Sequence, residues 1–180
     1  NAGFMTGQTR RVMFYVQHLL GVGHQIRAAA ITRAMQARGL EVHYVSGGFD
    51  EAGQDLGGAR RIQLPPARTA DAGFNTLLDA AGNPVDDAWE ESRRRALLDT
   101  FNSVVPDLLL VESFPFGRRR FRFELLPLLE TARGKALIAA SVRDILVARD
   151  DPDRTRWIVG IAESFFDAVI VHGDPRIAEF

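Results

Sequence analysis

The stretch "RVMFYVQHLLGVGHQIRAAAITRAM", Arg11 to Met35, contains the clearest strand-to-helix pattern in the sequence. Its first six residues are mostly apolar and rich in β-branched and aromatic side chains, which predicts a buried strand. A glycine-containing joint then leads into an alanine-rich amphipathic segment, which predicts a helix that ends at Gly39. The joint "GVGH", Gly21 to His24, is therefore either a tight turn between strand and helix or the edge of a site.

The same alternation of strand and helix continues along the chain. Further strands are expected at 41–46, 60–66, 107–112, 135–141 and 167–173, and helices at 86–103, 121–133 and 153–166. Strands that are apolar throughout are buried on both faces, and helices between them imply right-handed crossovers and a parallel sheet. The sequence thus predicts an α/β domain with a doubly wound parallel sheet (Rossmann-like) over residues 11–180, with 67–84 as its least regular region.

Two helices have a predicted inward face. The apolar residues that keep roughly helical spacing in the first helix are Ile26, Ala30, Ile31, Ala34, Met35 and Ala37. Those expected to face inward in the helix at 86–103 are Ala88, Trp89, Ala96, Leu97 and Phe101. The run Arg93 to Arg95 is expected on the solvated face of that helix, balanced by Glu90, Glu91 and Asp99.

Length and composition narrow the class of protein. The chain has 180 residues, which suits one domain, and its formal net charge of −1 provides no basic field to attract nucleic acid. The absence of cysteine excludes a disulfide framework and thiolate metal sites, and suits a cytoplasmic location. No apolar run approaches the ~20 residues of a membrane span. Residues 1–10 are expected to be a disordered start, with 1–4 a cloning remnant ahead of Met5.

Ligands of doubly wound sheets bind outside the carboxyl ends of the strands. The loops that follow the predicted strands all carry polar or glycine residues, so they supply the candidate site residues. These are Gly21, Gly23, His24, Ser46, Gly47, Gly48, Glu112, Ser113, Ser141, Arg143, Asp144, His172, Gly173 and Asp174. The segment 46–48 either admits a substrate close to its backbone or only makes a turn. Arg143 either holds a phosphate or carboxylate of a substrate or pairs with Asp144 at the surface.

The first loop does not fit the common nucleotide-binding motifs. A dinucleotide fingerprint would begin at Gly21 and Gly23, but Ile26 occupies its third glycine position, and no acidic residue ends the second strand. A phosphate-binding P-loop would need a lysine, which this loop lacks. The residue of this loop that indicates a chemical role is therefore His24.

His24 is expected at the N-terminus of the first helix, where the partial positive charge disfavours imidazolium. A neutral imidazole can act as a general base. Glu112 ends the strand expected beside the first strand at the switch point, where its carboxylate would orient the ring and stabilise its cation. The alternatives are a histidine that caps its helix or packs in the core, and a glutamate that pairs with nearby arginines.

At these residues the sequence resembles a family. "GVGH", "EVHYVSGG" (41–48) and "DLLLVESFPFG" (107–117) resemble the N-terminal half of the GT-B fold of glycosyltransferases, and are most similar to MurG-like and UDP-glycosyltransferase-like bacterial proteins. The resemblance runs from about residue 11 to 175. It implies that His24 takes the proton of an acceptor hydroxyl, and that Glu112 stands where the family has a partner aspartate.

The resemblance also implies the reaction and its participants. It implies a glycosyltransferase of hexosyltransferase type, with a nucleotide-sugar donor, UDP-linked in the family, as substrate and with no cofactor or metal. The donor would be bound by a C-terminal domain beyond Phe180, so this piece alone is expected to be inactive. The acceptor would be a small or lipid-linked molecule. The resemblance gives no role to nucleic acid.

Other interpretations stay open at this point. Residues 114–123 mix phenylalanines with arginines, which suits peripheral contact with the inner face of a membrane. The commonest explanation of such a segment is a helix start with inward phenylalanines and solvated arginines. For the whole chain, the alternatives are a sugar-nucleotide epimerase of GT-B architecture and a stand-alone Rossmann-like module that binds a small ligand or nucleotide.

Overall fold

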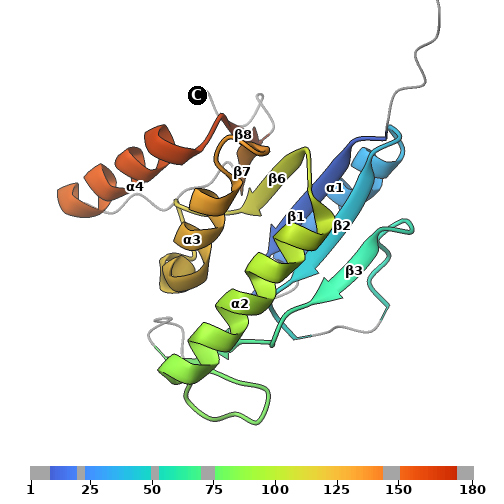
Figure 1. Cartoon of the computed structure of the whole chain (residues 1–180). Coiled ribbons are helices and arrows are strands. Elements are labelled where there is room, and N and C mark those ends of the chain that lie inside the picture. The colour runs from blue at the N-terminus through green and yellow to red at the C-terminus, as the bar shows by residue number, and fades with distance from the viewer. Residues whose placement is uncertain (1–8, 20–22, 50–52, 70–75, 144–150, 174–180) are drawn as a thin grey trace, which may run out of the picture.

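The computed structural model describes residues 9–19, 23–49, 53–69, 76–143 and 151–173. Its main sheet has six parallel strands in the order β3-β2-β1-β6-β7-β8 (Figure 1). The strands are β1 (Arg11–Val16), β2 (Glu41–Ser46), β3 (Arg60–Gln63), β6 (Leu108–Glu112), β7 (Leu137–Arg143) and β8 (Ala168–His172). The predicted doubly wound α/β fold is confirmed, and the strand order reverses between β1 and β6.

Helices cover the two faces of this sheet unequally. The helices are α1 (Gly23–Gln36), α2 (Asp87–Val104), α3 (Arg122–Ala132) and α4 (Pro152–Phe165), with a short 3₁₀ turn η1 (Arg119–Phe121) before α3. In Figure 1, α2 crosses in front of the sheet and α1 lies behind it. The core on the front face joins α2, α3 and part of α4 to the sheet, and the core behind it packs α1 mainly on β1 and β2.

Local signals explain where several elements begin and end. The Asp86 side chain accepts a hydrogen bond from the Trp89 backbone N–H and caps α2, and Asp151 does the same for α4. Gly39 follows α1 with φ of 81°, the left-handed conformation expected of its stop. The irregular region at 67–84 contains β4 (Arg68–Thr69) and β5 (Leu77–Leu78), a small antiparallel pair. Strands of two residues leave no periodic pattern in the sequence.

The predicted inward face of α1 is wrong in part. The side chains that α1 buries are Gln25, Ala28, Ala29 and Thr32. Ile26 is 64% exposed, and Ala30 and Ala34 are exposed as well. The sheet face beneath α1 already carries the large rings of Phe14 and Tyr44, whose centroids lie 6.0 Å apart. Small side chains therefore face the sheet at this contact.

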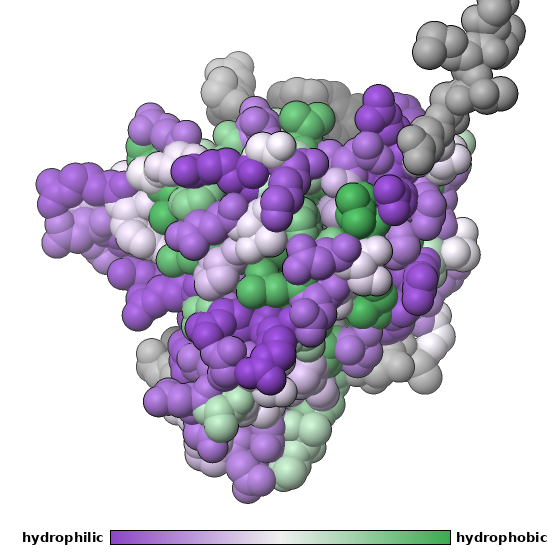
Figure 2. Space-filling view, in the orientation of Figure 1, coloured by the Kyte–Doolittle hydropathy of each residue, from purple (hydrophilic) through white to green (hydrophobic). Residues whose placement is uncertain are grey.

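The phenylalanine-rich segment at 114–123 packs largely inward. Phe114 and Phe121 are fully buried, and Phe116 and Phe123 are partly buried. Burial of these rings leaves little apolar surface here for insertion into a bilayer. Within the described ranges, no helix has the length and apolar character to cross a membrane. Figure 2 shows the face bearing α2 and α3 as mostly polar, with smaller apolar patches.

Candidate active site

The carboxyl ends of β1 and β6 lie side by side, and α1 begins beside them at Gly23. A Cβ added to Gly23 would meet nothing within 4 Å, so the start of α1 borders open space. The first turn of α1 contains no acidic residue, so nothing there opposes the positive end of the helix dipole. Gly21, the other glycine of the predicted joint, lies outside the described residues.

His24 and Glu112 meet at this position. The Nδ1 atom of His24 lies 2.7 Å from Oε1 of Glu112, across a separation of 88 residues in the sequence. The His24 side chain is 23% exposed and that of Glu112 only 1%, so the carboxylate forms the floor and the ring reaches solvent. Their predicted proximity is confirmed, while the catalytic role of the pair stays a prediction.

The contact constrains the chemistry of the ring. An ionised carboxylate only accepts hydrogen bonds, so the nitrogen that faces Glu112 carries a proton. In the neutral ring, the other nitrogen, Nε2, is then an acceptor. His24 is thus arranged to receive a proton at Nε2 while Glu112 holds the opposite side of the ring.

Two arginines that the sequence analysis did not assign to the site complete the cluster. The Nη2 atom of Arg27 donates to Oε1 of Glu112 at 2.5 Å, and Nε of Arg118 donates to the backbone oxygen of Gln17 at 2.6 Å. The position of Arg27, three residues after His24 in a predicted helix, was the available signal, because such residues share a face. Arg118 belongs to a run of three arginines that the sequence alone cannot separate.

The charges around Glu112 keep it ionised. Burial raises the pKa of Glu112, but the hydrogen bond from His24 and the positive charges of Arg118 and Arg27 lower it further, so the net pKa lies below its ordinary value. Burial also lowers the pKa of Arg118, an effect that the charge of Glu112 opposes. The site therefore pairs a permanent carboxylate with two guanidinium groups.

Other predicted residues gather on the neighbouring strands. Ser141 is the register partner of Glu112, and its hydroxyl lies 2.9 Å from Nε2 of His172. Burial lowers the pKa of His172, and the charge of Arg27 lowers it further, so Arg27 also acts on this part of the rim. The structure thus brings His24, Glu112, Ser141 and His172 to one edge of the sheet.

The remaining predicted residues on this rim are less closely tied to the pair. Ser113 follows Glu112 in the left-handed conformation with φ of 66°, and its N–H donates to the backbone oxygen of Ser141. Arg143 is exposed at the end of β7, and Gly173 is exposed after β8. Asp144 and Asp174 lie outside the described residues, so the alternative in which Arg143 pairs with Asp144 stays a prediction.

The glycines after β2 have a packing role. A Cβ on Gly47 would overlap the side chains of Gln17 and Arg93, and one on Gly48 would overlap the ring of His18. Ser46 is buried, and its backbone oxygen accepts from the backbone N–H of Leu64. Contact with neighbouring side chains therefore explains why this segment needs glycine, and substrate contact at 46–48 stays a prediction.

The prediction that Arg93 is solvated is wrong, because its side chain is fully buried. Its guanidinium bonds both carboxylate oxygens of Glu124, at 2.7 and 2.9 Å, and donates to the backbone oxygens of Gly47 and Pro65. The hydroxyl of Tyr15 donates to the same carboxylate at 2.5 Å. The arginine of this run that faces the sheet thus has a buried partner on α3, which local sequence cannot reveal.

This buried network is connected to the site. Gln17 accepts a bond from Arg93 on its side-chain oxygen at 2.5 Å, and its backbone oxygen accepts from Arg118. Arg118 in turn acts on Glu112. Gln17, the first residue after β1, is therefore held by the buried Arg93 through its side chain and by Arg118 through its backbone.

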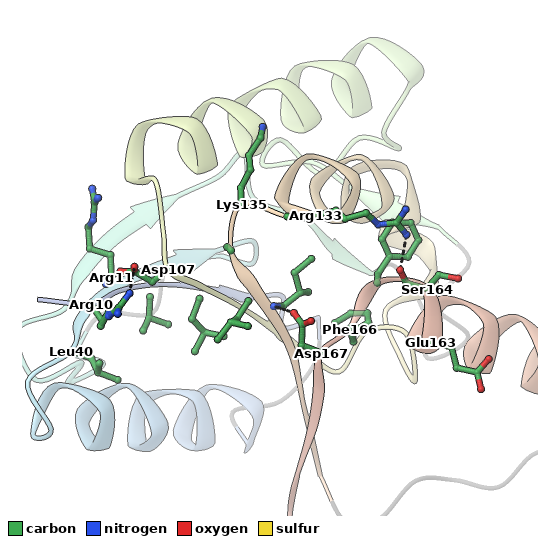
Figure 3. Close-up of a pocket in the computed structure, with 17 residues that line it drawn as sticks. Arg10, Arg11, Leu40, Asp107, Arg133, Lys135, Glu163, Ser164, Phe166 and Asp167 are labelled. Carbon is green, nitrogen blue, oxygen red and sulfur yellow. Dashed lines mark hydrogen bonds and ion pairs between the residues drawn. The ribbon is translucent and has the colours of Figure 1, made fainter. Parts of the chain in front are cut away.

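Two pockets lined by described residues lie at the opposite edge of the sheet. One of about 820 Å³ is lined by the amino ends of β1, β6 and β7 and by the C-terminal ends of α3 and α4 (Figure 3). Its charged side chains form hydrogen bonds at the ends of these strands and helices. Asp107 accepts from Arg10 and from the backbone of Arg11, and Arg133 donates to the backbone oxygen of Ser164. Arg10, predicted to belong to a disordered start, is therefore held to the folded part of the chain.

That pocket has the features of a structural groove. Ligands of doubly wound sheets bind at the carboxyl edge, which is where His24 and Glu112 lie. Within the described ranges, no three histidine, aspartate or glutamate side chains come together as metal ligands do. The carboxyl-edge cluster is therefore the candidate site.

Comparison with known proteins identifies the fold. No family model and no curated protein matches the chain. Among solved structures, SsfS6, a glycosyltransferase from Streptomyces sp. SF2575, matches with a TM-score of 0.55 and 16% identity over 94% of this chain and 52% of that one. Apo UGT2 from Phytolacca americana matches with a TM-score of 0.54 and 10% identity over 94% of this chain and 47% of that one. The chain thus spans about half the length of these proteins, and it has the α/β fold of one half of a GT-B glycosyltransferase.

Proposed function

We propose that this chain is the acceptor-binding N-terminal half of a glycosyltransferase that moves a sugar from a nucleotide-sugar donor to an acceptor hydroxyl. The observation that carries the proposal is the 2.7 Å contact between Nδ1 of His24 and Oε1 of Glu112. The pair stands at the carboxyl edge of the sheet, beside the strand-order reversal where such folds bind ligands. The likeness of the fold to half of two glycosyltransferases supports the same function.

The proposed reaction is a single displacement. Nε2 of His24 takes the proton of the acceptor hydroxyl as that oxygen forms a bond to the anomeric carbon of the donor. The bond from that carbon to the nucleotide diphosphate breaks, and the diphosphate leaves with the electron pair. A hydroxyl is a weak nucleophile at neutral pH, so a base is needed in the transition state. Attack from the side opposite the leaving group inverts the configuration of the sugar.

Glu112 and Arg27 both lie beside the positive charge that forms on His24 during the reaction. As His24 becomes an imidazolium, Glu112 already accepts its Nδ1 proton and stabilises the cation. Arg27 lies beside both groups, so the cation forms next to a permanent positive charge that bonds the same carboxylate.

The finer features of the proposal come from the sequence resemblance. They are a hexosyl donor linked to UDP, a small or lipid-linked acceptor, and a donor-binding domain elsewhere in the same polypeptide. A bacterial, MurG-like enzyme at the inner face of the membrane would combine them. The rings of Phe114 and Phe121 are buried, so any membrane contact through 114–123 would rely on its arginines and on Phe116 and Phe123.

The test is sugar transfer by a polypeptide that carries both halves. It would be incubated with UDP-hexoses and a mixture of hydroxyl-bearing acceptors, and the products detected by mass spectrometry. His24→Ala is expected to reduce transfer by about 10²–10⁴-fold, the range of general-base catalysis, without weakening donor binding. His43→Gln, which removes a histidine hydrogen-bonded to Glu41 at the far end of β2, is the control and should retain transfer.

Transfer at the wild-type rate by His24→Ala would exclude the base. Deuterium incorporation into the donor sugar in the absence of any acceptor would instead support the epimerase alternative.

A further inference from the structure

One oxygen of Glu112 has two donors, and the other has none among the described residues. Oε1 lies 2.7 Å from Nδ1 of His24 and 2.5 Å from Nη2 of Arg27, while Oε2 is buried without a hydrogen-bond partner. The two donors are themselves only 3.5 Å apart. When Nδ1 carries a proton, both groups are donors that share the same carboxylate oxygen, and the contact between them is one of donor against donor.

The fold places the two donors side by side. His24 and Arg27 are three residues apart in the first turns of α1, so their side chains project from the same face of the helix. Both approach the buried carboxylate from the solvent side, with exposed fractions of 23% and 22%. A movement of either side chain therefore changes how much of the Glu112 charge the other receives.

The two competitors differ in the permanence of their charge. The guanidinium of Arg27 is always protonated, whereas His24 is charged only while it holds a transferred proton. Among the described residues, the other charged or titratable groups that act on the pair or on Arg27 include Arg118 from the loop after β6, Tyr44 from β2 and His172 from β8. Of the described cations, Arg27 is the one whose guanidinium lies 3.5 Å from the His24 ring.

From this geometry we infer that Arg27 is a positioning residue of the proposed site. It holds the ionised Glu112 in place and shares with His24 the one carboxylate oxygen that the ring contacts. The inference rests on the proposed function only where it gives Arg27 a role in catalysis. The sharing of this oxygen is a property of the folded chain, and its effect on His24 can be measured without any substrate.

The experiment follows the His24 ring by NMR in the 180-residue chain as the pH is varied. His24→Gln identifies its signal among the four histidines. Arg27→Gln is expected to move the midpoint of the His24 titration upward by about one pH unit, because a nearby cation is lost and Glu112 becomes available to the ring alone. Arg27→Lys keeps a positive charge and should bring the midpoint back toward the wild-type value.

The controls separate this role from general effects of charge. Arg38→Gln removes the same charge from the exposed turn at the other end of α1 and should leave the midpoint unchanged. Glu112→Gln should move the midpoint downward. Arg27→Met, which keeps the aliphatic stem, replaces the glutamine variant if that one does not fold.

A folded Arg27→Gln or Arg27→Met chain in which His24 titrates at the wild-type pH or below it would overturn the inference. Loss of the fold in both variants would make Arg27 a structural residue and would overturn it as well. Failure of the transfer assay would remove the proposed function but leave the titration result standing, so the two failures are distinguishable.

Discussion

At the scale of single residues, the chemistry of the site depends on one carboxyl oxygen in a nearly dry position. Glu112 is 1% exposed and stays ionised because His24, Arg118 and Arg27 offset the effect of burial. A buried charge without such partners would shift its pKa and become neutral. The residue that organises the site therefore also makes the fold sensitive to acid.

The pH dependence of stability tests this. The folded-state pKa of Glu112 is lowered, so its stabilising contribution is present above the unfolded pKa of about 4.3 and is lost as the pH falls through the folded pKa. Glu112→Gln should therefore lose less stability than the wild type between pH 7 and pH 3. Urea unfolding of both chains at each pH measures the difference. Equal losses in the two proteins would contradict an ionised, stabilised Glu112.

At the scale of elements, the loops of the rim are held by a salt bridge between two helices. Arg93 of α2 and Glu124 of α3 are both fully buried, and together they bond Tyr15 and the backbone after β2 and β3. Burial, followed by the charge of Glu124, raises the pKa of Tyr15 well above its ordinary value, so the hydroxyl stays a donor. The network fixes the loops that follow the first three strands of the sheet.

Removal of one partner should be costly. Arg93→Met leaves Glu124 buried without its counter-charge and should lower the free energy of unfolding by about 3–5 kcal/mol. The double variant with Glu124→Leu should lose less than the sum of the two single changes. Arg95→Gln, on the exposed side of the same helix, should stay within about 0.5 kcal/mol of the wild type. Urea denaturation measures all four. A small effect of Arg93→Met would mean that water replaces the network.

The elements show what a sequence can predict here. The six main strands and four helices are visible because apolar runs and helical spacing are local properties. The proximity of His24 and Glu112 follows from the doubly wound strand order, which places β1 beside β6. The roles of Arg27 and Arg93 depend on partners 85 and 31 residues away, and in the sequence these arginines look like any solvated ones.

At the scale of the whole molecule, the candidate site and a groove lined by described residues lie at opposite edges of the sheet. His24 and Glu112 stand at the carboxyl edge, and the groove of about 820 Å³ lies at the amino edge. The chain spans about half of the glycosyltransferases that it matches. The proposed function therefore assigns acceptor chemistry to this half and places donor binding elsewhere in the polypeptide.

Calorimetric titration of the 180-residue chain with UDP-glucose tests that division. We expect a dissociation constant no tighter than about 1 mM, equivalent to a binding free energy of about −4 kcal/mol, because the donor contacts are proposed to lie in the other half. The control is the polypeptide that carries both halves, which should bind more tightly. Micromolar binding by the chain alone would contradict the division and favour a nucleotide-binding module.

The most direct test of the central claim is the tautomer of His24, read from the nitrogen-15 chemical shifts of its ring in the labelled chain. We predict that, when the ring is neutral, Nδ1 carries the proton and Nε2 is a free acceptor, and that Glu112→Gln weakens this preference. A neutral ring protonated at Nε2, with Nδ1 bare beside Glu112, could not accept a proton from a substrate at its open side and would contradict the proposed base.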